Sequence, residues 1–181
     1  MLLLAISGSL RARSTNTAAL QALSSLAPAD LDIVVYNSLA DLPAFNPDDD
    51  EEGATPPGSV QKLRSLVAAC DGIFIAAPEY AHGAPGALKN ALDWLVACES
   101  FAGKPVALIN CAPRAFHAQA QLRETLATMA ARLIPEAFGT LPLPGRAVDA
   151  QTILADARCE RILREALLAL QAAIGASKAQ P

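Results

Sequence analysis

Short aliphatic runs alternate with longer amphipathic stretches along most of the 181 residues. Apolar runs without polar interruption are typical of strands that are buried on both faces. Five such strands are predicted, the last of them weaker than the others, at residues 2–7, 31–36, 72–77, 105–110 and 134–138. Strands of this kind, separated by helices, predict a parallel sheet that is covered by helices on both faces.

Between the strands, apolar residues recur at intervals of three and four, which is the spacing of one helix face. These stripes lie within residues 19–26, 60–70, 88–96, 122–133 and 163–174. Ser14 is suited to cap the first of these helices, and Pro85 to open the third, because a proline has no N–H to leave unpaired there. The Pro-, Asp- and Gly-rich segment 37–58 is predicted to be a long surface loop.

Composition narrows the class of protein. Hydrophobic residues make up 52% of the chain and aromatic residues 4%, which excludes a globally disordered protein. No apolar run approaches the roughly 18 residues of a membrane span, and no basic segment precedes the short apolar run at the N-terminus. We therefore expect a single domain over residues 1–181, in the cytoplasm and without a membrane partner.

The charge is unevenly placed. The net charge of −4 includes five consecutive acids at 48–52, and without that run the balance is +1. No basic stripe is left to bind nucleic acid, and the acidic run is predicted to be a solvated loop.

An open parallel sheet binds ligands beyond the carboxyl ends of its strands, so the loops after strands one, three and four are the informative ones. The first, residues 7–16, has the sequence SGSLRARSTN, which is neither a P-loop nor G-x-G-x-x-G. It places hydroxyls, an amide, Arg11 and Arg13 at a helix N-terminus, where the helix dipole favours an anion such as a phosphomonoester. An ordinary turn, with Ser14 as cap and two solvated arginines, is an equally good interpretation.

The loop after strand three begins APEYAHGAPG and contains two prolines and two glycines. Such a loop is rigid and exposes backbone groups that can bind the edge of a flat heterocycle. Tyr80 and His82 either flank such a ligand or are a packing tyrosine and a surface histidine. Glu79 is interpreted as a cap of the following helix, and Lys89 with Asp93 as a surface pair at i and i+4.

The loop after strand four contains Cys111, a candidate thiol beside a ligand. A small buried residue at a strand end is the simpler interpretation. The four cysteines form no C-x-x-C pair and the chain has two histidines, so no metal site is expected.

Together, the segments GSLRARSTN and PEYAHGAPGALKNALDW resemble the NADPH-dependent FMN reductase family. The family patterns are close to G-S-x-R-x-x-S-x-N and P-E-Y-N-x-x-x-P-G-x-L-K-N-x-x-D-W, and its members include quinone, chromate and azo-compound reductases. The resemblance implies a flavodoxin-like α/β three-layer sandwich with a five-stranded parallel sheet in the order 2-1-3-4-5.

The resemblance also implies bound FMN. The positions that match those holding its phosphate are Ser9, Arg11, Ser14, Thr15 and Asn16. The positions that match the stretch along the isoalloxazine ring are Pro78, Glu79, Tyr80 and Ala81, and Cys111 falls where the family has a small or hydroxyl residue beside the flavin. Two departures bear on the substrate, because Ala81 stands where the family usually has Asn and CAPRAFHA replaces a Gly-rich turn after strand four.

The activity that this resemblance implies is hydride transfer from NADPH or NADH to FMN, followed by reduction of a quinone, free flavin or other small acceptor. No catalytic side chain is assigned, because the flavin carries the chemistry. A homodimer, or a homotetramer built as a dimer of dimers, is implied, with the helix near Trp94 at the interface. Two other functions stay open: a flavodoxin-type electron carrier, and a non-redox interaction protein that has lost FMN. The shortage of aromatic residues favours the reductase, because an unstacked flavin leaves one face open for two substrates in turn.

Overall fold

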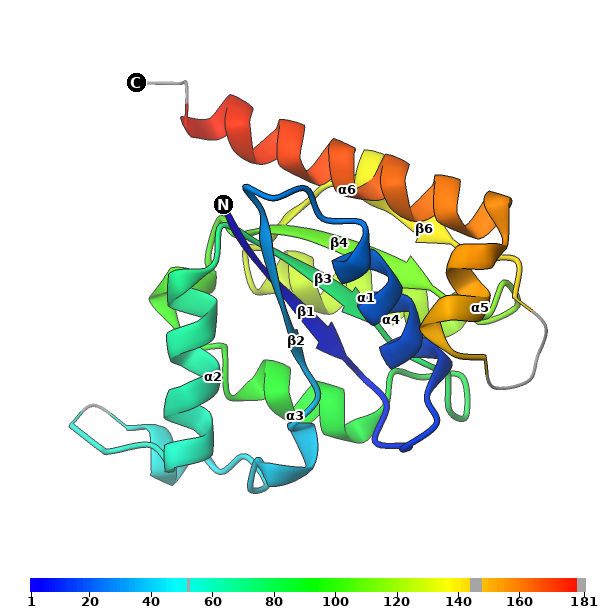
Figure 1. Ribbon diagram of the computed structural model, residues 1–181. Helices are drawn as coiled ribbons and strands as arrows, with labels where there is room; N and C mark the ends of the chain where they lie inside the picture. The colour runs from blue at the N-terminus through cyan, green and yellow to red at the C-terminus, as the bar shows by residue number, and fades with distance from the viewer. Residues whose placement is uncertain (52, 144–147, 179–181) are drawn as a thin grey trace.

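A parallel sheet lies between two layers of helices in the computed structural model, which describes residues 1–51, 53–143 and 148–178 (Figure 1). The strands follow the order β2-β1-β3-β4-β5, with β6 also paired to β4. Their bounds are β1 Leu2–Ser7, β2 Asp32–Tyr36, β3 Gly72–Ala76, β4 Pro105–Asn110, β5 Arg132–Leu133 and β6 Gly139–Thr140. The helices are α1 Thr15–Ser25, α2 Gly58–Ala69, α3 Gly86–Asp93, α4 Phe116–Thr128, α5 Ala150–Ala155 and α6 Ala157–Lys178. The predicted fold class and strand order are confirmed.

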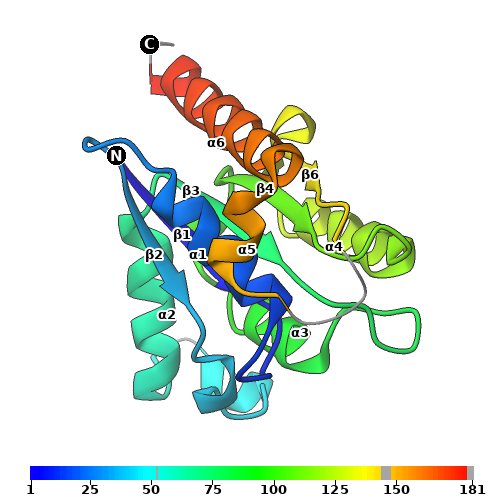
Figure 2. The ribbon, with the colours of Figure 1, turned by 45° about the vertical axis from the view of Figure 1, so that its right-hand side comes forward.

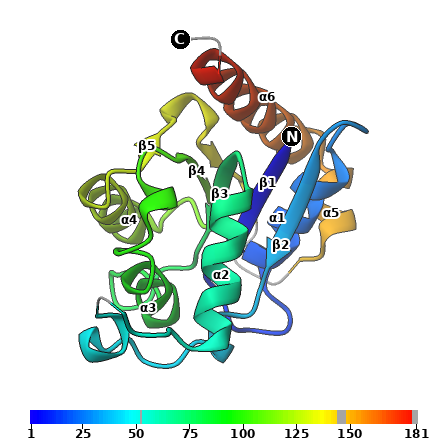
Figure 3. The ribbon, with the colours of Figure 1, turned by 90° about the vertical axis from the view of Figure 1, so that its left-hand side faces the viewer.

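The two faces of the sheet bury different side chains. In β3, Phe74 belongs to the core beneath α1 and α6, whereas Ile73 and Ile75 belong to the core beneath α2, α3 and α4. Successive side chains of a strand point to opposite faces, so both cores need an uninterrupted apolar run. Figure 3 shows the sheet between these two helix layers. Of the helices that the structure describes, none is long and apolar enough to cross a membrane.

The fifth strand, predicted at 134–138, is instead two short strands with a 3₁₀ turn between them. Both β5 and β6 pair in parallel with β4, and the turn spans Pro135–Ala137. Pro135 has no N–H to donate to a sheet, and its fixed φ suits the start of a turn. The prediction therefore placed the strand on the turn that separates the two observed strands.

The segment between β2 and α2 is more closely packed than the predicted surface loop. It contains 3₁₀ turns at Leu39–Asp41 and Pro47–Asp50. The Pro43 carbonyl accepts hydrogen bonds from Trp94 Nε1 and Asn90 Nδ2, both at 2.9 Å. These bonds hold the segment against the end of α3.

The acidic run is not wholly solvated, contrary to the expectation. Asp50 forms an ion pair with Arg64 at 2.7 Å, and only 8% of the Asp50 side chain is exposed. Arg64 also donates from Nε to the Trp94 carbonyl at 3.0 Å. The run's last residue, Glu52, lies outside the described residues.

The strands β1, β3 and β4 are parallel neighbours, so their carboxyl ends, at Ser7, Ala76 and Asn110, lie along one edge of the sheet (Figure 2). From β1 the chain moves to β2 on one side and then to β3 on the other. The strand order therefore reverses between β1 and β3, which is where such sheets bind ligands.

Candidate functional site

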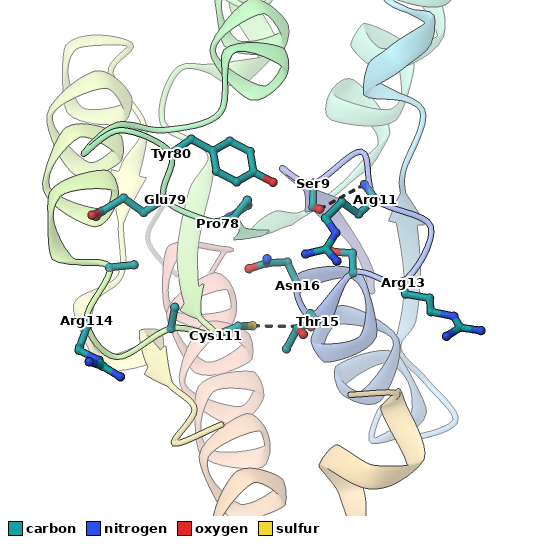
Figure 4. Close-up of a pocket in the computed structure, with 13 residues that line it drawn as sticks. Ser9, Arg11, Arg13, Thr15, Asn16, Pro78, Glu79, Tyr80, Cys111 and Arg114 are labelled. Atoms are coloured by element: carbon teal, nitrogen blue, oxygen red, sulfur yellow. Dashed lines mark hydrogen bonds between the residues drawn. The ribbon is translucent and has the colours of Figure 1, made fainter. Parts of the chain in front are cut away.

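A cavity of about 410 Å³ opens at this edge of the sheet (Figure 4). The loops that follow β1, β3 and β4 line it. Nine of the ten residues that the resemblance assigned to FMN come together here: Ser9, Arg11, Ser14, Thr15, Asn16, Pro78, Glu79, Tyr80 and Cys111. The tenth, Ala81, is exposed and does not line the cavity.

The loop after β1 is held against β3 by its backbone. Gly8 donates its N–H to the Ala76 carbonyl at 2.8 Å, and a Cβ on Gly8 would lie 2.8 Å from Ala77 Cβ, so only glycine fits. Ser14 caps α1, as predicted, by accepting the Thr17 N–H at 3.2 Å. The first turn of α1 has no acidic residue, so the positive end of its dipole lies in the cavity wall without a compensating carboxylate.

Asn16 shows that this wall suits a ligand. The residue is 8% exposed and lines the cavity, and its Oδ1 is buried with no hydrogen-bond partner in the described part of the chain. A buried polar atom without a partner costs about 1–3 kcal/mol, which a donor from a bound molecule would offset. Together with Arg11, the wall offers a buried acceptor and a cation to a ligand that carries hydroxyls and an anionic group.

The loop after β3 turns tightly between Tyr80 and Gly83. The Tyr80 N–H donates to the Gly83 carbonyl at 3.0 Å, and the Gly83 N–H donates to the Tyr80 carbonyl at 2.9 Å. Between them, Ala81 and His82 have φ of 48° and 60°, in the left-handed region that favours Gly and Asn. An Asn, which the family pattern has at the position of Ala81, would suit the backbone of this turn.

Glu79 caps a helix, but not the predicted one. Its Oε2 accepts the N–H of Ala118, in the first turn of α4, at 2.8 Å, whereas the following helix α3 has no side-chain cap. The positive end of the α4 dipole stabilises a carboxylate at this position. The contact joins the loop after β3 to the helix after β4, and so connects two walls of the cavity.

Cys111 is a free, buried thiol. Burial, with a smaller contribution from Cys159, raises the pKa of Cys111 to about 12. Its Sγ lies 3.8 Å from the Thr15 carbonyl oxygen, across the cavity floor (Figure 4). Cys111 is a small buried residue at a strand end, as the simpler interpretation expected, and it also lines the cavity in which a ligand would lie beside it.

His82 also follows the simpler interpretation. It is exposed, it does not line the cavity, and its ring stacks on that of His117 with 4.2 Å between centroids. Lys89 and Asp93 form the predicted surface pair at 2.5 Å.

Four lining residues were not among the ten that the resemblance assigned to FMN: Arg13, Ala112, Arg114 and Ala115. Arg13 occupies a variable position of the first motif, so the family pattern did not select it. The other three follow β4, where the chain departs from the Gly-rich pattern and offers no motif to match. A basic residue shortly after a central strand was the signal that could have identified Arg114.

Comparisons with known proteins agree with this geometry. A family model of NADPH-dependent FMN reductases matches residues 1–142. An NAD(P)H-dependent FMN reductase of Pseudomonas aeruginosa is 34% identical over 173 residues, which are 93% of this chain and 92% of that protein. A quinone reductase of Escherichia coli is 39% identical over 101 residues, which are 55% of this chain and 53% of that protein. A solved flavoenzyme of Paracoccus denitrificans, an NAD(P)H:acceptor oxidoreductase, superimposes with a TM-score of 0.78 at 27% identity over 97% of each chain.

Proposed function

Because the chain belongs to the NADPH-dependent FMN reductase family, we propose that its cavity binds FMN, through which electrons pass from NAD(P)H to a quinone, a free flavin or another small acceptor. Family membership makes the chain an NAD(P)H-dependent flavin oxidoreductase with FMN as its cofactor. The observation that carries the assignment to this cavity is the unpartnered Oδ1 of Asn16, in a wall shared with Arg11 and the N-terminus of α1.

The donors and acceptors of the cavity fit FMN. The N-terminus of α1 and the Arg11 guanidinium suit a phosphate dianion. Ser9 Oγ accepts the Arg11 N–H at 3.4 Å, which leaves the Ser9 O–H free to donate to the same phosphate. Asn16 Oδ1 suits a ribityl hydroxyl, and the backbone of Pro78 and Glu79 on the facing wall suits the edge of the ring.

Bound FMN would supply the redox chemistry, which is hydride transfer from NAD(P)H and two-electron reduction of the second substrate. The protein binds and orients it. The Glu79 carboxylate accepts the Ala118 N–H, so the N-terminus of α4 stabilises its negative charge. Tyr80 is 52% exposed and leaves the mouth of the cavity open to two substrates in turn. We assign no catalytic side chain.

The proposed acceptor class rests on the open mouth and on the relatives. The Escherichia coli relative is named a quinone reductase, and a flat quinone suits a cavity bordered by the ring of Tyr80. We also propose a single domain over 1–181, a cytoplasmic location, and a homodimer or homotetramer. Trp94 is fully buried against Phe45, with 5.0 Å between ring centroids, so the proposed interface would use the neighbouring Val96, which is 67% exposed.

Anaerobic spectroscopy tests the proposal. The purified protein is mixed with FMN, freed of unbound flavin, titrated with NADPH and then given 1,4-naphthoquinone. We expect stoichiometric flavin, bleaching of its visible absorbance by NADPH, and recovery on adding the quinone. Absence of bound flavin would contradict the proposal and favour an interaction protein. Bound flavin that NADPH does not bleach would favour an electron carrier.

A further inference from the structure

The wall of the cavity formed after β4 carries a cation without an anionic partner. Arg114 lines the cavity and is exposed, and it forms no ion pair with any residue that the structure describes. Arg11 and Arg13 lie across the cavity from it, on the loop after β1 (Figure 4). The cavity therefore presents positive charge from two opposite walls.

No carboxylate in the described part of the chain forms an ion pair with Arg114. Among the described lining residues Glu79 is the one carboxylate, and its Oε2 accepts the Ala118 N–H. Arg11 and Arg114 thus lie on opposite walls of the cavity, the Arg13 side chain extends outward (Figure 4), and the one carboxylate is already hydrogen-bonded. Once the FMN phosphate occupies the wall that carries Arg11, Arg114 on the opposite wall still attracts an anion that enters the mouth.

The phosphate of FMN does not account for Arg114. A phosphate is compact, and the proposed set for it, with Arg11 and the N-terminus of α1, lies on one wall. Arg114 comes from the opposite wall, beside the loop that carries Tyr80. A guanidinium in this place is suited to an anionic group on a different molecule, one that enters after the flavin.

We propose that Arg114 binds an anionic group of the reactant that enters the cavity mouth, and thereby favours reactants that carry a phosphate, sulfonate or carboxylate. This inference rests on the proposed function of the cavity as the FMN site. Two sources share the required chemistry: the phosphates of NAD(P)H, and an acidic substituent on the electron acceptor. Arg114 lies in the segment CAPRAFHA, which stands where the family pattern has a Gly-rich turn.

The test uses the FMN-loaded protein and three variants. Arg114→Gln removes the charge, Arg114→Lys keeps it, and Arg158→Gln makes the same change at an exposed residue of α6 outside the cavity. The perturbation of the flavin spectrum measures binding of NADP⁺, of 1,4-naphthoquinone-2-sulfonate and of neutral 1,4-naphthoquinone. Stopped-flow measurement of flavin reduction and of its reoxidation then separates the two substrates.

We expect Arg114→Gln to weaken the binding of NADP⁺, or the binding of the sulfonate relative to that of the neutral quinone. The expected loss of affinity is roughly tenfold or more, the scale of one charge-assisted hydrogen bond. A loss of affinity for NADP⁺ alone identifies the nucleotide as the source of the anion, and a loss of affinity for the sulfonate alone identifies the acceptor. Arg114→Lys should retain part of the preference, and Arg158→Gln all of it.

Equal affinities of Arg114→Gln and the unaltered protein for both anions, with FMN bound, would overturn the inference. A loss of FMN affinity in Arg114→Gln, with the anion preference retained, would overturn it too, because Arg114 would then bind the cofactor. Failure of the unaltered protein to bind FMN would instead refute the proposed function itself, so the two failures are distinguishable.

Discussion

Glu79 and Ala118 lie 39 residues apart in the chain and are joined by a 2.8 Å hydrogen bond from the Ala118 N–H to the Glu79 carboxylate. The bond caps α4 and ties together two walls of the cavity. Glu79→Ala should therefore lower the free energy of unfolding by about 1–2 kcal/mol, the scale of a lost N-cap that carries charge. It should also weaken FMN binding. Urea unfolding and flavin titration measure the two effects.

Glu79→Gln is the matched control, because it keeps an oxygen acceptor and removes the charge. It should retain most of the stability that Glu79→Ala loses. If Glu79→Ala unfolds at the same urea concentration as the unaltered protein, the contact does not stabilise the fold.

Arg11 is proposed to bind the phosphate of FMN. Arg11→Ala should weaken the binding free energy of FMN by about 1.5–3 kcal/mol, the contribution of a hydrogen bond to a charged group. Riboflavin has no phosphate, so its affinity should change little in the same variant. Flavin fluorescence titrations measure both affinities. Equal losses for the two flavins would mean that Arg11 contacts another part of the cofactor.

The thiol of Cys111 should resist alkylation. With a pKa raised to about 12 by burial, only about one molecule in ten thousand carries the reactive thiolate at pH 8. Cys98 is only half-buried and should react first with iodoacetamide. Mass spectrometry of peptides from the folded protein measures the order. Alkylation of Cys111 as fast as Cys98 would show that the strand end opens readily.

The ion pair between Asp50 and Arg64 is largely shielded from solvent. Asp50→Ala should lower the free energy of unfolding by about 1–2 kcal/mol, because the Arg64 guanidinium loses its partner in a partly buried place. Asp48→Ala, two residues earlier and exposed, should stay within about 0.5 kcal/mol of the unaltered protein. Chemical unfolding compares the two. Equal losses would indicate an effect of net charge rather than of the pair.

Ala130 follows α4 with φ of 57°, in the left-handed region. The Ala130 N–H donates to the Ala127 carbonyl at 3.0 Å and the Ala131 N–H to the Leu126 carbonyl at 2.9 Å, which is the pattern of a glycine-type helix end. Ala130→Gly should raise the free energy of unfolding by about 1 kcal/mol, since glycine adopts this φ without strain. Ala127→Gly, inside α4, should instead lower it by about 1 kcal/mol. Thermal unfolding of the pair checks the opposite signs.

The order and spacing of apolar residues were sufficient to predict most elements of this fold and three loops of the site. Apolar runs placed β1, β3 and β4, because a strand buried on both faces is apolar along its length, with polar Ser7 and Asn110 only at the carboxyl ends. Ser14 correctly predicted the start of α1, because an N-cap side chain bonds to a backbone N–H only three residues further along the chain. The motifs after β1 and β3 then identified eight residues that line one cavity, and Cys111 after β4 is the ninth.

Tertiary packing determines the contacts between segments that lie far apart in the chain. Glu79 caps α4 rather than α3, which is nearer in the sequence, and Asp50 pairs with Arg64. A hydrogen bond or an ion pair forms with the group that the fold brings within reach. The burial of Asn16 Oδ1 and the position of Arg114 across from Arg11 likewise exist only once three strand ends meet at one edge. Local sequence patterns carry no record of these distances, since each depends on elements that lie far apart in the chain.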